Sequence, residues 1–278
     1  MKILTDTGSI MTQERAKELG VVLFPLQVAI DGKNYRDYFD VSNEDFIEMT
    51  KTAIPVSSQP AVGEVMEQYE DKKETLHITM TSGLSATYNS AFGIVQSTEA
   101  DHVTLFNSKT LAGTQQYLVE LAVKLRDSNT VSEIVERMDY CLSECVSFLI
   151  PEDFDYLKRG GRLSPIAATL GGLIRIKPIV TQTEGSQTLE RFGFGRNWKR
   201  AINNIIEEML KNGVSDKHKI YVSHAENKNA ADIAESMVKA AIENIDVEVL
   251  VLTPAMITQG GPGCLAIQYI LKDPLVDL

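Results

Sequence analysis

The sequence predicts a two-domain α/β protein, and three observations predict it. Apolar runs of strand length alternate with segments of helical periodicity along almost all of the 278 residues. Hydrophobic residues make up 44% of the chain, which is enough for one large or two ordinary domain cores. Gly-rich connections begin after residue 150 and change the texture of the sequence. We therefore expect an N-terminal domain over residues 1–150, with a mostly parallel, helix-covered sheet, and a C-terminal α/β domain over residues 151–278.

The first half alternates strands and helices in the order that builds a parallel sheet. Each expected strand is a short apolar run, and each expected helix has a helical apolar pattern or follows a polar turn. The strands span residues 2–6, 21–30, 76–80 and 103–107; the helices span residues 13–20, 43–51, 112–127 and 131–145, with one more entered from a polar turn within residues 57–71 and another from about Ser85.

The second half continues the alternation after a Gly-rich connection. A cleft between two α/β halves is the default place for a ligand. The expected helices span residues 166–174, 197–212 and 229–244, the expected strands span residues 175–182, 187–194, 218–225 and 247–253, and an apolar run at 264–271 follows a Gly-Pro loop.

The charge of the chain argues against several functions. The formal net charge is -11, and only residues 192–201 are locally basic, so we expect no nucleic-acid partner. No apolar run reaches the length of a membrane span, so we expect no stable membrane insertion. The first residues resemble a strand and not a signal peptide, which favours a cytoplasmic location.

We also expect neither a metal nor a cofactor. The three cysteines and four histidines show no familiar metal spacing, and Cys141 and Cys145, four apart on an expected helix, are interpreted as packing residues. No phosphate-loop or dinucleotide motif occurs. Two Gly clusters, at 158–164 and 258–263, are open to two interpretations: turns that need positive φ, or loops close to a ligand.

Two turns rich in hydroxyl groups indicate a site for a carboxylate. Ser82 and Ser85 follow the apolar strand at 76–80 and precede a helix, whose first N–H groups lack partners of their own. Ser57 and Ser58 open another helix in the same manner. Helix capping would explain one or two of these hydroxyls. In a parallel sheet both turns would lie at the carboxyl ends of strands, where ligands bind, and could hold one anionic group together.

A nucleophilic role for Ser85 is the main alternative. Residues 83–87 nearly fit the G-x-S-x-G elbow, and His224 lies downstream as a base. Thr87 replaces the last Gly of that motif, and no HGGG-like oxyanion segment occurs. A serine hydrolase or thioesterase thus remains the alternative, and an interaction protein with a vestigial pocket is a third possibility.

Four segments in order resemble the DegV family of fatty-acid-binding proteins. The segment "SSQPAVGE" is similar to the family's T-S-Q-P turn, and "TSGLSATYNSA" to its S-S-x-L-S-G-T-Y segment. Likewise, "FDYLKRGGRLS" is similar to Y-L-x-x-G-G-R-[IV]-S, and "GGPG" to the C-terminal G-P-G loop. The opening "TDTGSIM" is similar to a D-S-T start, so the resemblance covers essentially the whole chain.

The resemblance implies a non-catalytic carrier that buries one long-chain fatty acid between its domains. Such carriers present the carboxylate to a separate ATP-dependent fatty-acid kinase, whose acyl phosphate product is used in phospholipid synthesis. The resemblance places Ser57 and Ser82 on the family's carboxylate-binding positions. It places Arg196 on a position associated with the kinase, although an isolated Arg is more often a surface residue. Gln259 stands where many members have His, and Ala86 where they have Gly. From the residues and the resemblance together, the candidates are Ser57, Ser58, Ser82 and Ser85 for the carboxylate, Arg196 for the partner, and Gly83, Arg162, Gln259 and Gly261 near the pocket.

Overall fold

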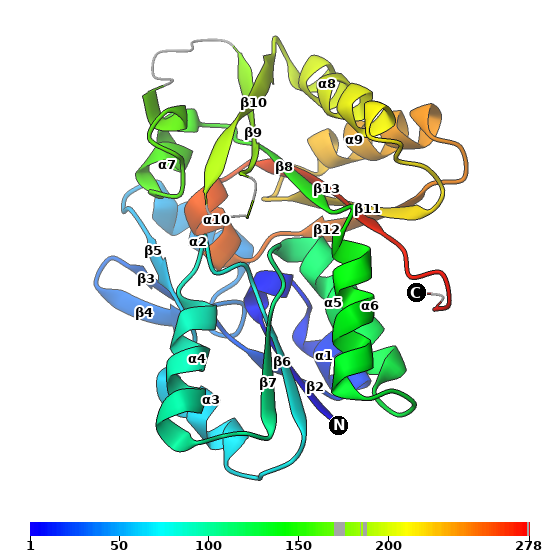
Figure 1. The fold of residues 1–278 in the computed structure, drawn as a ribbon. Helices are drawn as coiled ribbons and strands as arrows, with labels where there is room; N and C mark the ends of the chain where they lie inside the picture. The colour runs from blue at the N-terminus through cyan, green and yellow to red at the C-terminus, as the bar shows by residue number, and fades with distance from the viewer. Residues whose placement is uncertain (170–175, 184, 186–187, 277) are drawn as a thin grey trace.

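The computed structural model describes residues 1–169, 176–183, 185, 188–276 and 278. It contains a four-stranded sheet, a three-stranded sheet and a six-stranded sheet (Figure 1). The predicted α/β class is confirmed. Among the described residues, no helix combines the length and the apolar character that a membrane crossing requires.

The N-terminal four-stranded sheet is parallel throughout, with strand order β2-β1-β6-β7. Successive residues of β1 point to opposite faces, so Ile3 packs toward α5 and α6 while Leu4 packs toward α3 and α4. Helices therefore cover both faces, as the sequence predicted (Figure 1). The elements are β1 (Lys2–Asp6), β2 (Val21–Phe24), β6 (Thr75–Thr79), β7 (Val103–Asn107), α1 (Gln13–Leu19), α3 (Val62–Tyr69), α4 (Thr87–Thr98), α5 (Ala112–Leu125) and α6 (Val131–Leu142), with a 3-10 turn η1 (Thr7–Ser9) after β1.

The apolar run at 21–30 forms two strands and not one. Pro25 has no N–H to donate, and the chain leaves the parallel sheet there. The second piece, β3 (Gln27–Ile30), pairs antiparallel with β4 (Lys33–Arg36) and β5 (Val56–Ser58) in the three-stranded sheet. A hairpin turn with positive φ at Asp31 and Gly32 connects β3 to β4. The helix α2 (Asn43–Thr50) follows β4.

This small sheet corrects the expected setting of Ser57 and Ser58. Both serines lie on β5, an antiparallel edge strand, and not on a turn at the carboxyl end of a parallel strand. The helix α3 begins only at Val62. The prediction was wrong because β5 is three residues long and polar, so its sequence has the composition of a turn.

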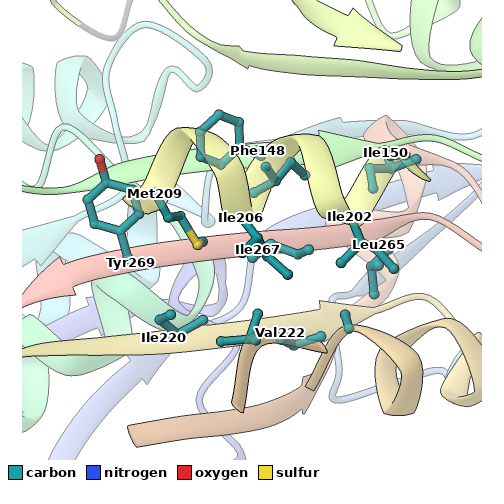
Figure 2. Packing of buried hydrophobic residues seen from close by; sticks show 14 of the residues in the cluster. Phe148, Ile150, Ile202, Ile206, Met209, Ile220, Val222, Leu265, Ile267 and Tyr269 are labelled. Carbon is teal, nitrogen blue, oxygen red and sulfur yellow. The ribbon is translucent and has the colours of Figure 1, made fainter. Parts of the chain in front are cut away.

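The six-stranded sheet has the order β10-β9-β8-β13-β11-β12 and is mixed. Helices α8 and α9 cover one face with a core of branched apolar residues, including Ile206 and Ile267 (Figure 2). The opposite face contributes Tyr221 and Ile270 to the core around α5. The elements are β8 (Val146–Ile150), β9 (Lys177–Gln182), β10 (Leu189–Gly195), β11 (His218–His224), β12 (Asp246–Val251), β13 (Leu265–Leu271), α7 (Phe154–Arg159), α8 (Trp198–Lys211), α9 (Lys228–Ala241) and α10 (Pro254–Gly260).

Two expectations for the second half need comment. The described part of the helix expected at 166–174 is a 3-10 turn, η2 (Ala167–Thr169), and its remainder lies outside the described residues. The division of the chain at residues 150 and 151 stays a proposal; β8, which ends at Ile150, pairs within the six-stranded sheet.

The helices α7 and α10 contact each other; α7 lies beside β9 and β10, and α10 lies where the six-stranded sheet meets the N-terminal elements (Figure 1). The helix α10 also contacts β3, β5 and α2. The three-stranded sheet, the β6–α4 turn and the six-stranded sheet therefore meet around α10, and the candidate site lies there.

Candidate functional site

An apolar cavity lies between the sheets, beside α10. Its walls come from the β6–α4 turn (Met80, Leu84), from β8 and β9 (Leu149, Val180) and from α10 (Met256). It encloses about 780 Å³ of atom-free space, including the open solvent at its mouth. No Asp or Glu occurs among the described residues that line it.

A polar mouth adjoins this cavity. It is lined by Ser57, Ser58 and Ser85 and encloses about 500 Å³ of atom-free space. Arg162 and Gln259 line both spaces, so the polar mouth and the apolar cavity are neighbours. The combination suits a ligand with one polar end and a long apolar part.

Two serine hydroxyls of the candidate set accept a hydrogen bond from a side-chain amide. Gln259 donates from Nε2 to Ser57 Oγ at 2.9 Å, and Asn107 donates from Nδ2 to Ser82 Oγ at 2.8 Å. Neither hydroxyl donates to an acceptor within the described part of the chain. Each O–H therefore stays available to donate to a ligand.

The structure does not bring all the predicted serines to one place. Ser57, Ser58 and Ser85 line the mouth, whereas Ser82 lines neither the mouth nor the apolar cavity and is bound to Asn107 at the end of β7. Gly83 lies in the turn beside Ser82 and also lines neither space.

The Ser85 hydroxyl is paired with Thr87, Oγ to Oγ1, at 2.8 Å, and it accepts the Thr87 N–H. The helix α4 begins at Thr87, two residues after the expected start, and its N-cap Ala86 provides no side-chain cap. His224, the base of the hydrolase alternative, accepts the Asn227 N–H through Nδ1 at 3.2 Å. Burial lowers the pKa of His224. Among the described contacts, no hydrogen bond joins Ser85 to His224 as a nucleophile and its base would require.

Arg162 supplies the positive charge of the site. Of the described residues that line the apolar cavity and the mouth, it alone carries a charge. Its Nε donates to Leu84 O at 3.2 Å and its NH1 donates to Gly160 O at 2.6 Å. No carboxylate within the described ranges pairs with it. Burial lowers the pKa of Arg162, but a guanidinium stays protonated in proteins.

The Gly clusters satisfy both interpretations that the sequence left open. A Cβ at Gly160 would lie 2.5 Å from Gln259 Oε1, so the missing side chain lets this amide approach α7. Gly161 and Gly261 have φ values of 71° and 85°, where glycine is favoured. A Cβ at Gly261 would also lie 3.0 Å from the Tyr156 ring. These turns are therefore strained for other residues and lie next to the site.

A buried carboxylate that the sequence did not indicate fastens α10 in place. Asp37 accepts hydrogen bonds from Thr7 Oγ1 at 2.5 Å, Thr253 Oγ1 at 2.9 Å and Ala255 N at 2.8 Å. It joins η1 to the start of α10. Burial raises the pKa of Asp37 to about 6. Burial also raises the pKa of Asp6 to about 6, and Asp6 Oδ2 accepts a hydrogen bond from Met80 N. The sequence signal, an isolated Asp after β4, is too common to interpret.

The remaining candidates lie away from the cavity. Arg196 is exposed between β10 and α8, and it forms no ion pair with any described residue. Cys141 lies in the core around α5, and burial raises the pKa of its thiol to about 12. The described residues contain no group of His, Cys, Asp and Glu that could hold a metal ion.

Fold and site together define a class: an α/β protein in which the six-stranded sheet, the β6–α4 turn and α10 enclose an apolar cavity that ends in a mouth of hydroxyl groups and one guanidinium. The chain belongs to the DegV family, because the family model described as "Uncharacterised protein, DegV family" matches residues 1–272. It is 29% identical over 277 residues to a DegV domain-containing protein of Staphylococcus aureus, covering 97% of this chain and 98% of that protein. A similar protein of Listeria monocytogenes is 28% identical over 280 residues, with the same coverage.

Solved structures share the whole fold. Bacillus subtilis DegV, described as a fatty acid binding protein, matches with a TM-score of 0.85 at 24% identity, over 98% of this chain and 99% of that one. A DegV family protein from Thermus thermophilus, whose structure is described in terms of its fatty acid binding, matches with a TM-score of 0.87 at 22% identity, over 98% of this chain and 99% of that one. A stearic acid-binding protein from Eubacterium ventriosum matches with a TM-score of 0.85 at 21% identity, over 99% of both chains.

Proposed function

We propose that this protein binds a long-chain fatty acid, with the acyl chain in the apolar cavity and the carboxylate at the polar mouth. The observation that carries the proposal is the contrast between the two spaces: an apolar, acid-free cavity that shares Arg162 with a mouth of serine hydroxyls. The fatty acid binding of the similar Bacillus and Thermus proteins supports it.

The energetics divide between the two ends of the ligand. Burial of the acyl chain contributes about 0.8 kcal/mol per methylene, so the chain provides most of the affinity. Hydrogen bonds to a charged group contribute about 1.5–3 kcal/mol each, which fixes the orientation. Ser57, Ser58, Ser85 and Arg162 would hold the carboxylate from the mouth. Ser82 stays in the proposal on the strength of the resemblance and of its free O–H.

The proposed role is that of a carrier without chemistry of its own or a cofactor. A separate cytoplasmic fatty-acid kinase would act on the exposed carboxylate. In that step a carboxylate oxygen forms a bond to the γ-phosphorus of ATP, the bond from this phosphorus to the bridging oxygen breaks, and ADP leaves. Arg196 would face the kinase, since it is exposed and unpaired among the described residues and lies in the locally basic segment.

Binding measurements on serine variants test the carrier against the hydrolase. The double variant Ser57→Ala and Ser82→Ala should lose most of its affinity for palmitate, measured by displacement of a fluorescent fatty acid. Ser143→Ala is the matched control, since this exposed serine caps α6 through Tyr140 O and lines neither the mouth nor the apolar cavity. Hydrolysis of an acyl ester that vanishes in both Ser85→Ala and His224→Gln would contradict the carrier role.

A further inference from the structure

The wall that the six-stranded sheet gives to the apolar cavity contains polar side chains. Successive residues of a strand point to opposite faces of its sheet. On β8, Phe148 and Ile150 pack in the core beneath α8 and α9, so Ser147 and Leu149 face the apolar cavity, which both line. Gln268 of the neighbouring strand β13 pairs with Ser147 in the sheet register and lines the same cavity.

The strand β9, on the other side of β8, continues this row. The register that pairs Phe148 with Thr181 places Gln182 opposite Ser147, and Gln182 also lines the apolar cavity. We call Gln268, Ser147 and Gln182 the polar row, because they lie side by side across three neighbouring strands. The adjacent row of the same face is apolar and consists of Ala266, Leu149 and Val180.

The polar row lies deeper in the cavity than the apolar row. The strand β8 runs toward Ile150 and leads into α7, and β13 begins at Leu265, shortly after α10. Arg162, which follows α7, and Gln259, which lies on α10, mark the position of the mouth. The polar row is two residues further from that end of both strands, which corresponds to about 7 Å. A chain that enters from the mouth therefore passes the apolar row before it reaches the polar one.

The hydroxyl of Ser147 has an unused donor. Its Oγ accepts a hydrogen bond from Gln268 Nε2 at 2.7 Å, and its O–H donates to no acceptor among the described residues. The residue is only 9% exposed. Gln268 itself is satisfied, because its Oε1 accepts from Gly113 N at 3.1 Å and its Nε2 also donates to Leu111 O at 3.0 Å. Buried hydroxyls normally find an acceptor, so the Ser147 O–H indicates a polar group on the ligand that fills the cavity.

Gln182 offers the complementary acceptor. Its Nε2 donates to Lys109 O at 3.5 Å, and its Oε1 accepts from no described residue. The polar row thus presents one free donor and one free acceptor on adjacent strands, and an alcohol is the group that can use both. No charged side chain belongs to the row, so a neutral hydroxyl suits it better than a second carboxylate, which would be buried without a counter-charge.

We propose that the polar row is a subsite for a hydroxyl group on the acyl chain, and that the ligands of this protein include hydroxylated long-chain fatty acids. Ser147 donates to the hydroxyl oxygen of the ligand, and this hydroxyl donates to Gln182 Oε1. An unsubstituted chain in the same place leaves both protein atoms unpaired. The inference rests on the proposed function, since it takes the carboxylate to lie at the mouth and the chain in the cavity.

Stearate and a series of monohydroxystearates that differ in the position of the hydroxyl test the subsite. Each is measured as a competitor of a fluorescent fatty acid, below its micelle concentration. Wild type should prefer one isomer, or two neighbouring ones, over stearate by about fivefold, as expected for one neutral hydrogen bond. Ser147→Ala should abolish this preference, and Gln182→Leu should reduce it.

The variants are suited to the comparison. In Ser147→Ala, Gln268 Nε2 keeps Leu111 O and Thr114 Oγ1 as acceptors, so the fold should survive. Ser223→Ala is the matched control and should keep the preference. Ser223 is a buried serine of the same sheet whose hydroxyl also lacks a partner among the described residues, but it does not line the cavity.

The outcomes separate this inference from the proposed function. A preference that persists in Ser147→Ala, or that is equal for all isomers, overturns the subsite. A preference for oleate in place of every hydroxystearate also overturns it, because the cavity would then select the shape of the chain. Failure of wild type to bind stearate and all its hydroxylated forms overturns the proposed function and this inference with it, whereas stearate binding without a Ser147-dependent preference overturns the inference alone.

Discussion

Ser57→Ala should weaken both ligand binding and the ligand-free fold, because the Ser57 hydroxyl has a partner on each side. It accepts the Gln259 amide at 2.9 Å, and its O–H is free for a carboxylate. Loss of one hydrogen bond to a charged group costs about 1.5–3 kcal/mol, or about 10- to 150-fold in Kd. Without Ser57, Gln259 Nε2 also loses its partner, and Oε1 is already buried without one. The free energy of unfolding should therefore fall by about 1–3 kcal/mol.

Two assays separate these effects. Displacement of a fluorescent fatty acid measures the affinity, and urea unfolding of delipidated protein measures the stability. Ser57→Thr keeps the hydroxyl and should keep both properties, and Ser143→Ala is the control for loss of an exposed serine hydroxyl. The double variant Ser57→Ala and Gln259→Leu should recover stability, since no polar group is then left unpaired, but not affinity. An affinity within twofold of wild type in Ser57→Ala would refute the reasoning.

Three further predictions concern the surroundings of the site. Burial raises the pKa of Asp37 from 3.8 to about 6, so the folded state resists its ionisation. The contribution of Asp37 to the free energy of unfolding should be fully present below about pH 4 and should fall by up to about 3 kcal/mol as the pH rises from about 4 through 6. Urea unfolding of Asp37→Asn should show a smaller pH dependence over this interval than wild type, and an unchanged dependence would contradict the assignment. Gly160→Ala should push the Gln259 amide away, since a Cβ would lie 2.5 Å from Oε1, and should weaken the affinity for palmitate. The control is Gly63→Ala on α3, where no atom lies within 4 Å of the new Cβ; it should stabilise the protein by about 0.5–1 kcal/mol and leave palmitate binding unchanged. Equal effects of the two variants on binding would contradict the assigned contact. Ala266→Phe fills part of the apolar cavity and should shift the preference toward shorter acyl chains, by about 0.8 kcal/mol for each methylene excluded, in a chain-length series of competitors; an unchanged preference would place the acyl chain elsewhere.

The fold was predictable where local patterns decide it. The strand expected at 2–6 is β1, and the strands expected at 76–80 and 103–107 match β6 and β7 within one residue. Their apolar runs are long enough to require burial on both faces, which only a helix-covered parallel sheet provides. The error at 21–30 has a local cause as well: Pro25 ends β2, and the Asp-Gly turn that follows β3 is a hairpin signal that the interpretation passed over.

The site was predictable only in part, because its contacts join distant segments. Ser57, Arg162 and Gln259 were candidates from the sequence, and all three line the mouth. The hydrogen bond from Gln259 to Ser57 spans 202 residues, and that from Arg162 to Leu84 spans 78. No local spacing encodes such pairs. The contact between the Tyr156 ring and Gly261 likewise exists only because α7 lies against α10.

The central claim is that a free fatty acid occupies the apolar cavity with its carboxylate at the mouth. Native mass spectrometry of freshly purified protein, compared with the denatured mass and with an organic extract of the same sample, tests it most directly. The account predicts additional mass that disappears on denaturation and appears in the extract as about one equivalent of free fatty acid. Mass that remains attached as an ester at Ser85 would contradict the account, and so would protein that is empty and does not take up added fatty acid.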